Sequence, residues 1–397
     1  MDEVMVVDGN KAAALGAMLS KPVVVAAYPI TPQTPLVEYL SQLIADGLLD
    51  ADLVEVESEH SALSVLQGAS LAGGRVFTGT SGQGLAFMFE PYIRTAPLRL
   101  PIVMVIATRD GISPQCVWGG QQDAITVRDG GWIQIFVENN QEILDTVIMA
   151  YKIGEDSEVL LPVNVCYDGF YLSHMSEAIK IPGQTLVDQF LPPYRPDHVK
   201  LDPELPMAVD PLTSGILFTR YRQGHLEAQE KAKEVIGRVD EEFGKIFGRS
   251  YGGLIENYRM EDAEIALVAM GSPCGTGKVV VDRARERGIK VGLVKVRALR
   301  PFPVERLLDS LKDVRAIGVV DKNVCFGWGT GVLYMELSAT LKGLSIPIFD
   351  FIGGLGGSDI TCDHFELAIR RTMEAAEGKP FKRVHWFGLE EPLDYGG

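Results

Sequence analysis

The sequence predicts an α/β protein with a doubly wound parallel sheet domain followed by a second, smaller α/β domain. Short apolar runs rich in Val, Ile and Ala alternate with segments of helical spacing, which is typical of βαβ units and parallel sheets. A Pro-rich stretch at residues 182–215 separates two such regions. The 397 residues are enough for two or three domains.

The first domain is predicted to span residues 1–181. Apolar residues at helical spacing mark its helices, and fully apolar or β-branched runs mark its strands. Asp8 is a candidate N-cap for the first helix. In order, helices are expected at 9–19, 36–47, 62–72, 85–96 and 141–154, and strands at 22–27, 52–56, 74–80, 100–107, 132–137 and 159–167.

Residues 182–258 are predicted to connect the two domains. Seven prolines between 182 and 211 indicate an irregular chain, which is followed by a charge-rich amphipathic helix at 227–247. The second domain is expected at 259–378, and residues 379–397 lack periodicity and are expected to form an irregular tail. The strands of the second domain are expected at 263–270, 291–296, 316–320 and 346–351.

Charge and composition bound the possible functions. A formal net charge of −16 disfavours nucleic acid and anionic membranes as partners. No apolar run reaches the length of a membrane span, and the first residues lack the basic region of a secretory signal, so a cytoplasmic location without a membrane is expected. The five cysteines form no Cys-x-x-Cys pair, so neither an iron–sulfur nor a zinc site is expected in this chain.

The stretch from Tyr28 to Pro35 is the first candidate for function. Its prolines at 29, 32 and 35 fix φ and remove backbone donors, so it is expected to be neither helix nor central strand. It follows a buried strand directly, and ligands of open α/β sheets bind at the carboxyl ends of strands. The alternative interpretation is a rigid connection between strand and helix.

Two further strand ends carry chemically useful side chains. Glu57 and Glu59 follow the second strand, although two carboxylates at the start of a helix also stabilise its positive end without any other role. Arg109 follows the fourth strand and begins a long polar loop that runs to residue 123. Parallel strand ends meet at one edge of a sheet, so the proline stretch, Glu59 and Arg109 are expected to converge there.

Other motifs fail on spacing. Residues 271–278 resemble a phosphate-binding loop, but five residues separate the first glycine from Gly277-Lys278, and Val279 follows. A thiamine-type metal motif is incomplete around Asp129, since position 128 is Arg and the nearest Asn comes too soon. No metal site is therefore expected in this chain.

Several motifs together resemble one family. They are Tyr28-Pro29-Ile30-Thr31-Pro32, 56–63 (VESEHSAL), 83–86 (QGLA), 128–134 (RDGGWIQ), 248–251 (GRSY), 300–303 (RPFP), 326–327 (FG) and 353–357 (GGLGG). In this order they resemble the α subunit of 2-oxoacid:ferredoxin oxidoreductases, the pyruvate synthase group, over nearly the whole chain.

The resemblance implies a thiamine diphosphate-binding-type first domain, which would hold the aminopyrimidine ring, and a second domain like the transketolase C-terminal domain. Thiamine diphosphate would be shared with a partner subunit, and Mg²⁺ and [4Fe–4S] clusters would lie in partner subunits. The implied partners are β and γ subunits, with or without a δ subunit, and ferredoxin as electron acceptor.

The same resemblance implies roles for individual residues. Glu59 matches the glutamate that hydrogen-bonds a pyrimidine nitrogen and so promotes proton removal from the thiazolium ring, and its burial would raise its pKa. Thr31 matches a substrate-binding threonine, and Arg109 matches the arginine that holds the substrate carboxylate, for which its planar fork is suited. We also expect substrate contacts from Tyr28, Asp110 and Gln115, and cofactor contacts from Pro29, Ile30 and Gln83.

The chain departs from the pyruvate enzymes in two places. After Arg109 the usual apolar run is replaced by a polar one that includes Asp110 and Gln115, and the usual Gly-Gly-Arg-Asp has Ser358 in place of its arginine. An apolar wall suits the methyl group of pyruvate, whereas the second carboxylate of oxalate needs donors. Oxalate oxidation to two CO₂ is therefore favoured slightly over coenzyme A-dependent pyruvate oxidation.

The awkward charge of Asp110 beside Arg109 suggests a loop that swings between two positions. A non-catalytic scaffold subunit and a transketolase-type transferase are the rival functions. Retention of both Glu59 and Arg109 argues against the first, and the incomplete thiamine motif argues against the second.

Overall fold

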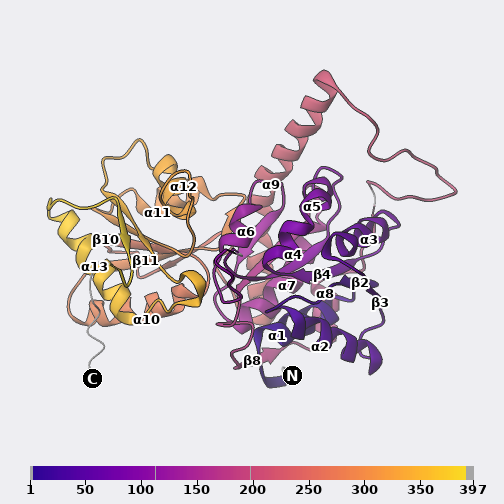
Figure 1. Ribbon diagram of the computed structural model, residues 1–397, viewed down its shortest axis with the longest axis horizontal. Coiled ribbons are helices and arrows are strands. Elements are labelled where there is room, and N and C mark those ends of the chain that lie inside the picture. Colours follow the sequence, from indigo (N-terminus) through magenta and orange to yellow (C-terminus); the bar gives the residue numbers. More distant parts are fainter. Residues whose placement is uncertain (1–2, 112, 197, 390–397) are drawn as a thin grey trace.

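The computed structural model describes residues 3–111, 113–196 and 198–389. It shows two α/β units side by side, with a long helix that projects beyond the first unit (Figure 1). This arrangement confirms the predicted fold class of two parallel α/β domains. Among the described residues, no helix combines the length and the apolar character that a membrane span needs.

The first sheet has seven strands, and six of them run parallel. Its central strand β5 is apolar and completely buried, as expected for a strand covered by helices on both faces. In spatial order the strands are β12 (Ala298–Arg300), β6 (Ile133–Phe136), β7 (Val163–Asp168), β5 (Val103–Thr108), β4 (Val76–Thr80), β2 (Val24–Ala27) and β3 (Asp52–Glu55).

Two groups of helices cover this sheet. In the first group α1 packs against both α7 and α2, and in the second α3 packs against α4 and α5 (Figure 1). Asp8 caps α1 as predicted, because its side chain accepts a hydrogen bond from the Lys11 N–H. The helices are α1 (Gly9–Ser20), α2 (Thr34–Ala45), α3 (Glu59–Leu71), α4 (Gly82–Phe87), α5 (Phe89–Thr95), α6 (Gln122–Thr126) and α7 (Asn140–Gly154).

The strand order reverses between β2 and β4. From β2 the chain moves to β3 on one side, and it then crosses over β2 to continue with β4 and β5 on the other side. In open α/β sheets the crevice at such a reversal, outside the carboxyl ends of the strands, is where ligands bind. The segments that follow β2, β3, β4 and β5 therefore border the expected binding position.

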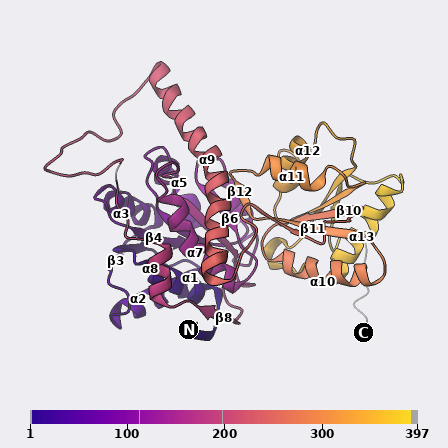
Figure 2. The same cartoon turned by 180° about the vertical axis from the view of Figure 1, so that it is seen from behind.

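The connector contains more regular structure than predicted. It contains α8 (Gln184–Phe190), which directly follows β8 (Glu177–Ile181), the last strand of the predicted first domain, and β8 pairs antiparallel with β1 (Glu3–Val7). Helix α9 (Gly215–Phe247) has 33 residues and begins twelve residues before its expected start. Its C-terminal half packs on α7 and α8, and its N-terminal half extends past the body of the domain (Figure 2).

The second sheet has six strands, of which β9 alone runs antiparallel. Its spatial order is β15 (Val384–Trp386), β14 (Ile348–Ile352), β13 (Ile317–Asp321), β10 (Ile265–Ala269), β11 (Val291–Val296) and β9 (Ile255–Tyr258). Its helices are α10 (Pro273–Glu286), α11 (Val304–Leu311), α12 (Val332–Thr340), α13 (Cys362–Ala376) and the 3₁₀ turn η1 (Leu355–Gly357).

Three short strands join a sheet that the expected domain limits did not assign to them. Strand β9 lies in the predicted connector but pairs with β11, and β12 lies in the predicted second domain but completes the first sheet. Strand β15 lies in the tail expected to be irregular and pairs with β14, while residues 390–397 of that tail lie outside the described residues. Three or four residues are too few to show a periodicity, so only pairing with a sheet edge reveals them.

A buried ion cluster joins the two domains. Glu142, in the first turn of α7, accepts hydrogen bonds from Lys295 Nζ at 2.7 Å and from Arg297 Nε at 2.6 Å. All three residues are almost completely buried. Burial opposes ionisation of Glu142, but the two cations outweigh it and lower its pKa. The cluster therefore holds β11 and the segment after it against α7.

The second domain contains a buried pair of carboxyl groups, Asp321 and Asp350. Asp321 accepts backbone hydrogen bonds at the start of α12, from Leu333 N at 3.1 Å and Tyr334 N at 2.9 Å. Asp350 accepts one from Gly331 N at 2.7 Å. Burial raises the pKa of Asp321 to about 6, and burial together with the Asp321 charge raises the pKa of Asp350 well above its usual range.

We expect Asp350→Asn to stabilise the protein at pH 8. The folded-state pKa values exceed those of an unfolded chain, so the folded state keeps protons that the unfolded state releases, and stability falls as the pH rises from about 4 through about 6. An asparagine still accepts from Gly331 and carries no charge, so a gain of about 1–2 kcal/mol is expected. Thermal unfolding at pH 5 and pH 8, with exposed Asp46→Asn as control, measures it; no gain at pH 8 would contradict the prediction.

Candidate active site

The proline stretch follows β2 and forms the first wall of the candidate site. Asn10 Nδ2 donates to the Pro32 carbonyl at 2.9 Å and to the Ser173 carbonyl at 3.1 Å, which fixes the stretch to the domain body. Tyr28, Pro29 and Thr31 are exposed, and Ile30 is half-buried. These residues are thus held rigidly while their side chains stay accessible to a ligand or partner.

The expectation that residues 28–35 contain no helix is corrected at its end. Helix α2 begins at Thr34, and Pro35 lies in its first turn. Proline is tolerated there because a first-turn N–H has no partner within the helix. The loop proper is therefore two residues shorter than predicted.

Glu59 is the first residue of α3, whose N-cap is Ser58. Its side chain is buried, and burial raises its pKa, as expected from the sequence. Glu57 differs, because it is exposed and accepts a hydrogen bond from the Ser61 hydroxyl, which lowers its pKa. Stabilisation of the positive end of the helix is therefore a sufficient explanation for Glu57. Burying the carboxyl group of Glu59 costs folding free energy, and this cost indicates a functional role.

The turn after β4 lies between Glu59 and Arg109. A Cβ atom on Gly84 would lie 2.5 Å from Glu59 Oε1, and one on Gly82 would overlap the Arg109 guanidinium. Gly82 also has a φ of +49°, which favours glycine. Both glycines are therefore required for the backbone to approach the two charged side chains.

Arg109 follows β5 and is 3% exposed. Its Nη2 donates to Gln83 Oε1, while its Nε has no hydrogen-bond partner among the described residues. Burial lowers its pKa, and the nearby charges of Asp123 and Glu59 act in the opposite direction. The structure thus brings together Glu59, Gln83 and Arg109, which the sequence predicted to act at one site.

Several buried polar atoms at this edge lack a partner within the described residues. They are Gln33 Nε2, Thr80 Oγ1, Ser81 Oγ and Arg109 Nε. Buried polar groups in native proteins are normally hydrogen-bonded, so a cluster without partners indicates a place for polar ligand atoms. This observation fits the polar ring of a cofactor and the carboxylate of a substrate.

The second domain holds the polar loop that follows Arg109. Asp110 accepts a hydrogen bond from the Gly356 N–H in η1, and Gly357 N donates to the Gly119 carbonyl at 2.7 Å. Burial raises the pKa of Asp110. Gln115 is exposed. Asp110 therefore faces the second domain in this structure, and the predicted swing of the loop would have to break its bond to Gly356.

Sequence reasoning missed Asp123, which lies in α6 and is 8% exposed. Its Oδ2 accepts hydrogen bonds from Gly82 N at 2.8 Å and from Arg109 N at 3.1 Å. Burial raises its pKa to about 7. A carboxylate at the end of a long functional loop was the available signal, but only the tertiary contacts show what it binds.

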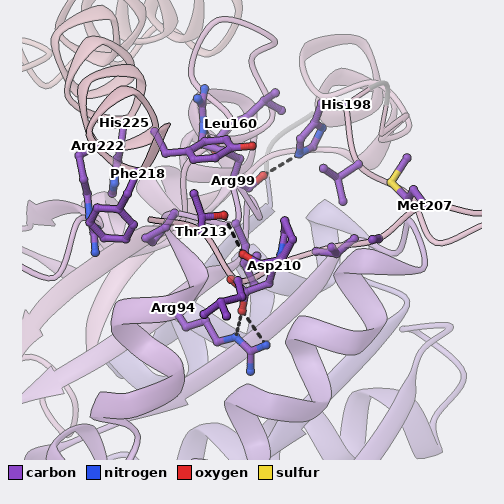
Figure 3. A pocket seen from close by; sticks show the side chains of 18 of the residues that line it. Arg94, Arg99, Leu160, His198, Met207, Asp210, Thr213, Phe218, Arg222 and His225 are labelled. Carbon is purple, nitrogen blue, oxygen red and sulfur yellow. Dashed lines mark hydrogen bonds and ion pairs between the residues drawn. The ribbon is translucent and has the colours of Figure 1, made fainter. Parts of the chain in front are cut away.

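A separate cavity of about 890 Å³ lies beneath the start of α9 (Figure 3). Arg94 and Asp210 pair inside it, and His198 contacts the Arg99 carbonyl. Arg99 and Leu160 precede β5 and β7, so the cavity lies at the amino ends of the strands, and none of the predicted site residues line it. It is therefore distinct from the candidate active site.

Residues 271–278 do not form a phosphate-binding loop. Lys278 Nζ contacts Glu138 at 2.8 Å and Glu256 at 2.8 Å, so its charge is already paired. The Ser272 side chain donates to Asp168. The segment instead runs from the end of β10 into the first turns of α10 and helps to join the two domains.

Comparison with known families gives two matches. The family described as pyruvate flavodoxin/ferredoxin oxidoreductase, thiamine diphosphate-binding, matches residues 15–241. Residues 263–365 match the core domain II of pyruvate:ferredoxin oxidoreductase. The two matches correspond closely to the two α/β units of the structure.

Curated relatives match over nearly the full length. The chain is 51% identical to the α subunit of the NADH-dependent phenylglyoxylate dehydrogenase of Aromatoleum evansii, over 95% of this chain and 92% of the relative. It is 48% identical to the pyruvate synthase subunit PorA of Methanothermobacter thermautotrophicus, over 97% and 98%.

Solved structures show the same fold. A 2-oxoglutarate:ferredoxin oxidoreductase from Magnetococcus marinus superposes with a TM-score of 0.72 at 21% identity, covering 94% of this chain and 65% of that longer chain. A split-gene transketolase superposes with a TM-score of 0.55 at 13% identity, covering 92% and 96%.

The fold and these matches define a protein of the thiamine diphosphate-binding class. Within that class, the chain belongs to the pyruvate flavodoxin/ferredoxin oxidoreductase family, as an α subunit of the 2-oxoacid:ferredoxin oxidoreductase type.

Proposed function

We propose that this chain works with partner subunits to decarboxylate a 2-oxoacid oxidatively, with Glu59 serving the cofactor and Arg109 the substrate. The observation that carries the proposal is the position of both buried side chains on either side of the Gly82–Gly84 turn, at the reversal of strand order. A buried acid and a buried arginine in one cluster are costly for stability and useful for catalysis.

The residues at this edge fit thiamine diphosphate, for which the chain would supply one half of the binding site. Gln83, Pro29, Ile30 and Glu59 would contact this cofactor beside the glycine turn, where Gly84 closely approaches Glu59, and Thr80 and Ser81 offer hydroxyls without a partner among the described residues. When bound there, the cofactor would supply a carbon nucleophile for the 2-oxo carbon and a sink for the electron pair left by decarboxylation. The protonated fraction of Glu59, increased by burial, allows it to exchange a proton with a ring nitrogen.

Arg109 is suited to hold the carboxylate that is lost as CO₂. Its Nε is buried without a partner, and among the described residues its guanidinium forms no ion pair with a carboxylate. A guanidinium that keeps donors free can bind a carboxylate with two parallel hydrogen bonds. Thr31 and Tyr28, exposed at the tip of the proline stretch, would contact the same substrate from the opposite side.

The proposal also concerns which 2-oxoacid is the substrate. The polar loop favours oxalate, and coenzyme A-dependent oxidation of pyruvate is the alternative. The contribution of Asp110 to that preference is weakened by its bond to Gly356, since this carboxylate is already engaged and would repel a second one. Several relatives are named as pyruvate synthase subunits, which supports the pyruvate alternative.

An aromatic 2-oxoacid is a further candidate. The relative that is 51% identical is named for phenylglyoxylate. Trp118 precedes Gly119, which pairs with Arg109 in an isolated β-bridge. The ring centroids of Trp118 and Phe170 lie 4.6 Å apart. Because Gly169 packs on Pro32, this aromatic pair lies near the proline stretch and could border a phenyl group.

Partner subunits complete the proposed enzyme. They would hold the diphosphate with its Mg²⁺ and the [4Fe–4S] clusters that pass electrons onward. Ferredoxin is the proposed acceptor, although one relative carries NADH in its name, so both acceptors belong in the test. Of the two rival functions, a transketolase-type transferase predicts no electron transfer from any 2-oxoacid, whereas a scaffold subunit predicts that replacing Glu59 or Arg109 leaves the turnover of the complex unchanged.

Dye reduction by the purified complex tests the proposal. Oxalate, pyruvate and phenylglyoxylate are each supplied with and without coenzyme A, and ferredoxin and NAD⁺ are then compared as acceptors. We expect reduction with at least one of the three acids. Reduction by oxalate without coenzyme A would support the oxalate preference, and reduction by none of the three would refute the proposed activity.

A further inference from the structure

The carboxylate of Asp123 links two strand ends of the candidate site. Its Oδ2 accepts from Gly82 N, after β4, at 2.8 Å and from Arg109 N, after β5, at 3.1 Å. Its Oδ1 accepts from Ala124 N at 2.7 Å, and its own N–H donates to the Arg109 carbonyl at 3.3 Å. One buried side chain therefore fixes the backbone on both sides of the guanidinium.

These contacts restrain Arg109 while leaving its charged group available. Asp123 binds the backbone N–H of Arg109, and the guanidinium is contacted by the neutral amide of Gln83 instead. The negative charge of Asp123 still favours the charged form of the arginine from a short distance. A direct ion pair would have occupied the donors that a substrate carboxylate needs.

The same contacts set the position of the glycine turn. Gly82 and Gly84 pack against Arg109 and Glu59, so a shift of this turn would move both side chains relative to each other. A displacement of about 1 Å can reduce the rate of an enzyme by about 100-fold.

We propose that Asp123 is a positioning residue that holds Arg109 and the Gly82–Gly84 turn in register for the reaction. This inference rests on the proposed function, because it assigns to Arg109 the substrate carboxylate. Asparagine has almost the same shape, but its NH₂ group would face either the N–H groups of Gly82 and Arg109 or the N–H of Ala124, so in each orientation at least one backbone donor loses its acceptor.

The test compares Asp123→Asn with Asp240→Asn in the full complex. Asp240 is also buried and accepts backbone hydrogen bonds, from Tyr251 N at 2.9 Å and Gly252 N at 3.1 Å, but it lies in α9, outside the candidate site. For Asp123→Asn we expect kcat/KM for the 2-oxoacid to fall by about 100-fold, with KM raised, while thiamine diphosphate affinity by calorimetry stays within about threefold. Asp240→Asn should lower thermal stability and leave KM unchanged.

A double-mutant cycle with Arg109→Ala separates positioning from a general structural effect. If Asp123 acts through Arg109, its replacement adds little once the guanidinium is gone. Full additivity, or wild-type kinetics of Asp123→Asn, would overturn the inference while leaving the proposed function intact. Failure of Asp123→Asn to assemble, when Asp240→Asn assembles, would assign Asp123 to folding and also overturn it. A wild-type complex inactive with every 2-oxoacid would instead refute the proposed function and the inference with it.

Discussion

Replacement of Glu59 by glutamine is expected to lower kcat by about 10²–10⁴-fold without preventing assembly of the complex. Glutamine preserves the shape of the side chain beside Gly84, but it cannot release or accept a proton at its carbonyl end. Burial raises the pKa of Glu59, which favours its protonated form relative to that of an exposed glutamate. Turnover with the preferred 2-oxoacid, together with size-exclusion chromatography, measures both effects.

Glu57→Gln is the matched control for this variant. Glu57 lies two positions away in the same turn region, but it is exposed and accepts a hydrogen bond from the Ser61 hydroxyl. Its replacement should leave kcat within about twofold, because exposed substitutions rarely matter. Normal turnover of Glu59→Gln, or of the more drastic Glu59→Ala, would refute the role assigned to Glu59.

Replacement of Arg109 by alanine is expected to reduce kcat/KM by about 100-fold or more, through both a higher KM and a lower kcat. A guanidinium that binds the substrate carboxylate contributes to affinity, and it also orients the 2-oxo carbon. Arg109→Lys should recover only part of the loss, because a lysine keeps the charge without the planar pair of donors. Steady-state kinetics over a range of 2-oxoacid concentrations separate KM from kcat.

Arg94→Ala serves as the control for Arg109. Arg94 is half-exposed and pairs with Asp210 in the cavity at the amino ends of the strands, so its loss should not change KM. Unchanged kinetics of Arg109→Ala would show that another cation holds the substrate carboxylate.

Much of the candidate site was predictable from local sequence. The apolar strand before Tyr28 and the prolines after it placed a rigid loop at a strand end, and Glu59 and Arg109 follow two further strands. A parallel α/β fold brings such strand ends to one edge, and the structure has Glu59, Gln83 and Arg109 together there. The roles of the individual residues came from the resemblance to a family and stay predictions that the variants above test.

Other features depended on contacts between distant segments. Asp110 was expected at the substrate, but its partner is Gly356, 246 positions later in the chain. Strands β12 and β15 are too short to carry a pattern, and each exists because a sheet edge supplies its hydrogen bonds.

The sequence alone determined the alternation of strands and helices, the rigidity of the proline stretch and the family, because these depend on local periodicity and on motifs read in order. Only the tertiary structure decided that Asp123 joins Gly82 to Arg109 and that the second domain holds the loop after Arg109. The physical reason is that a buried carboxylate is satisfied by whichever N–H groups the folded backbone brings to it, and those groups can come from any part of the chain.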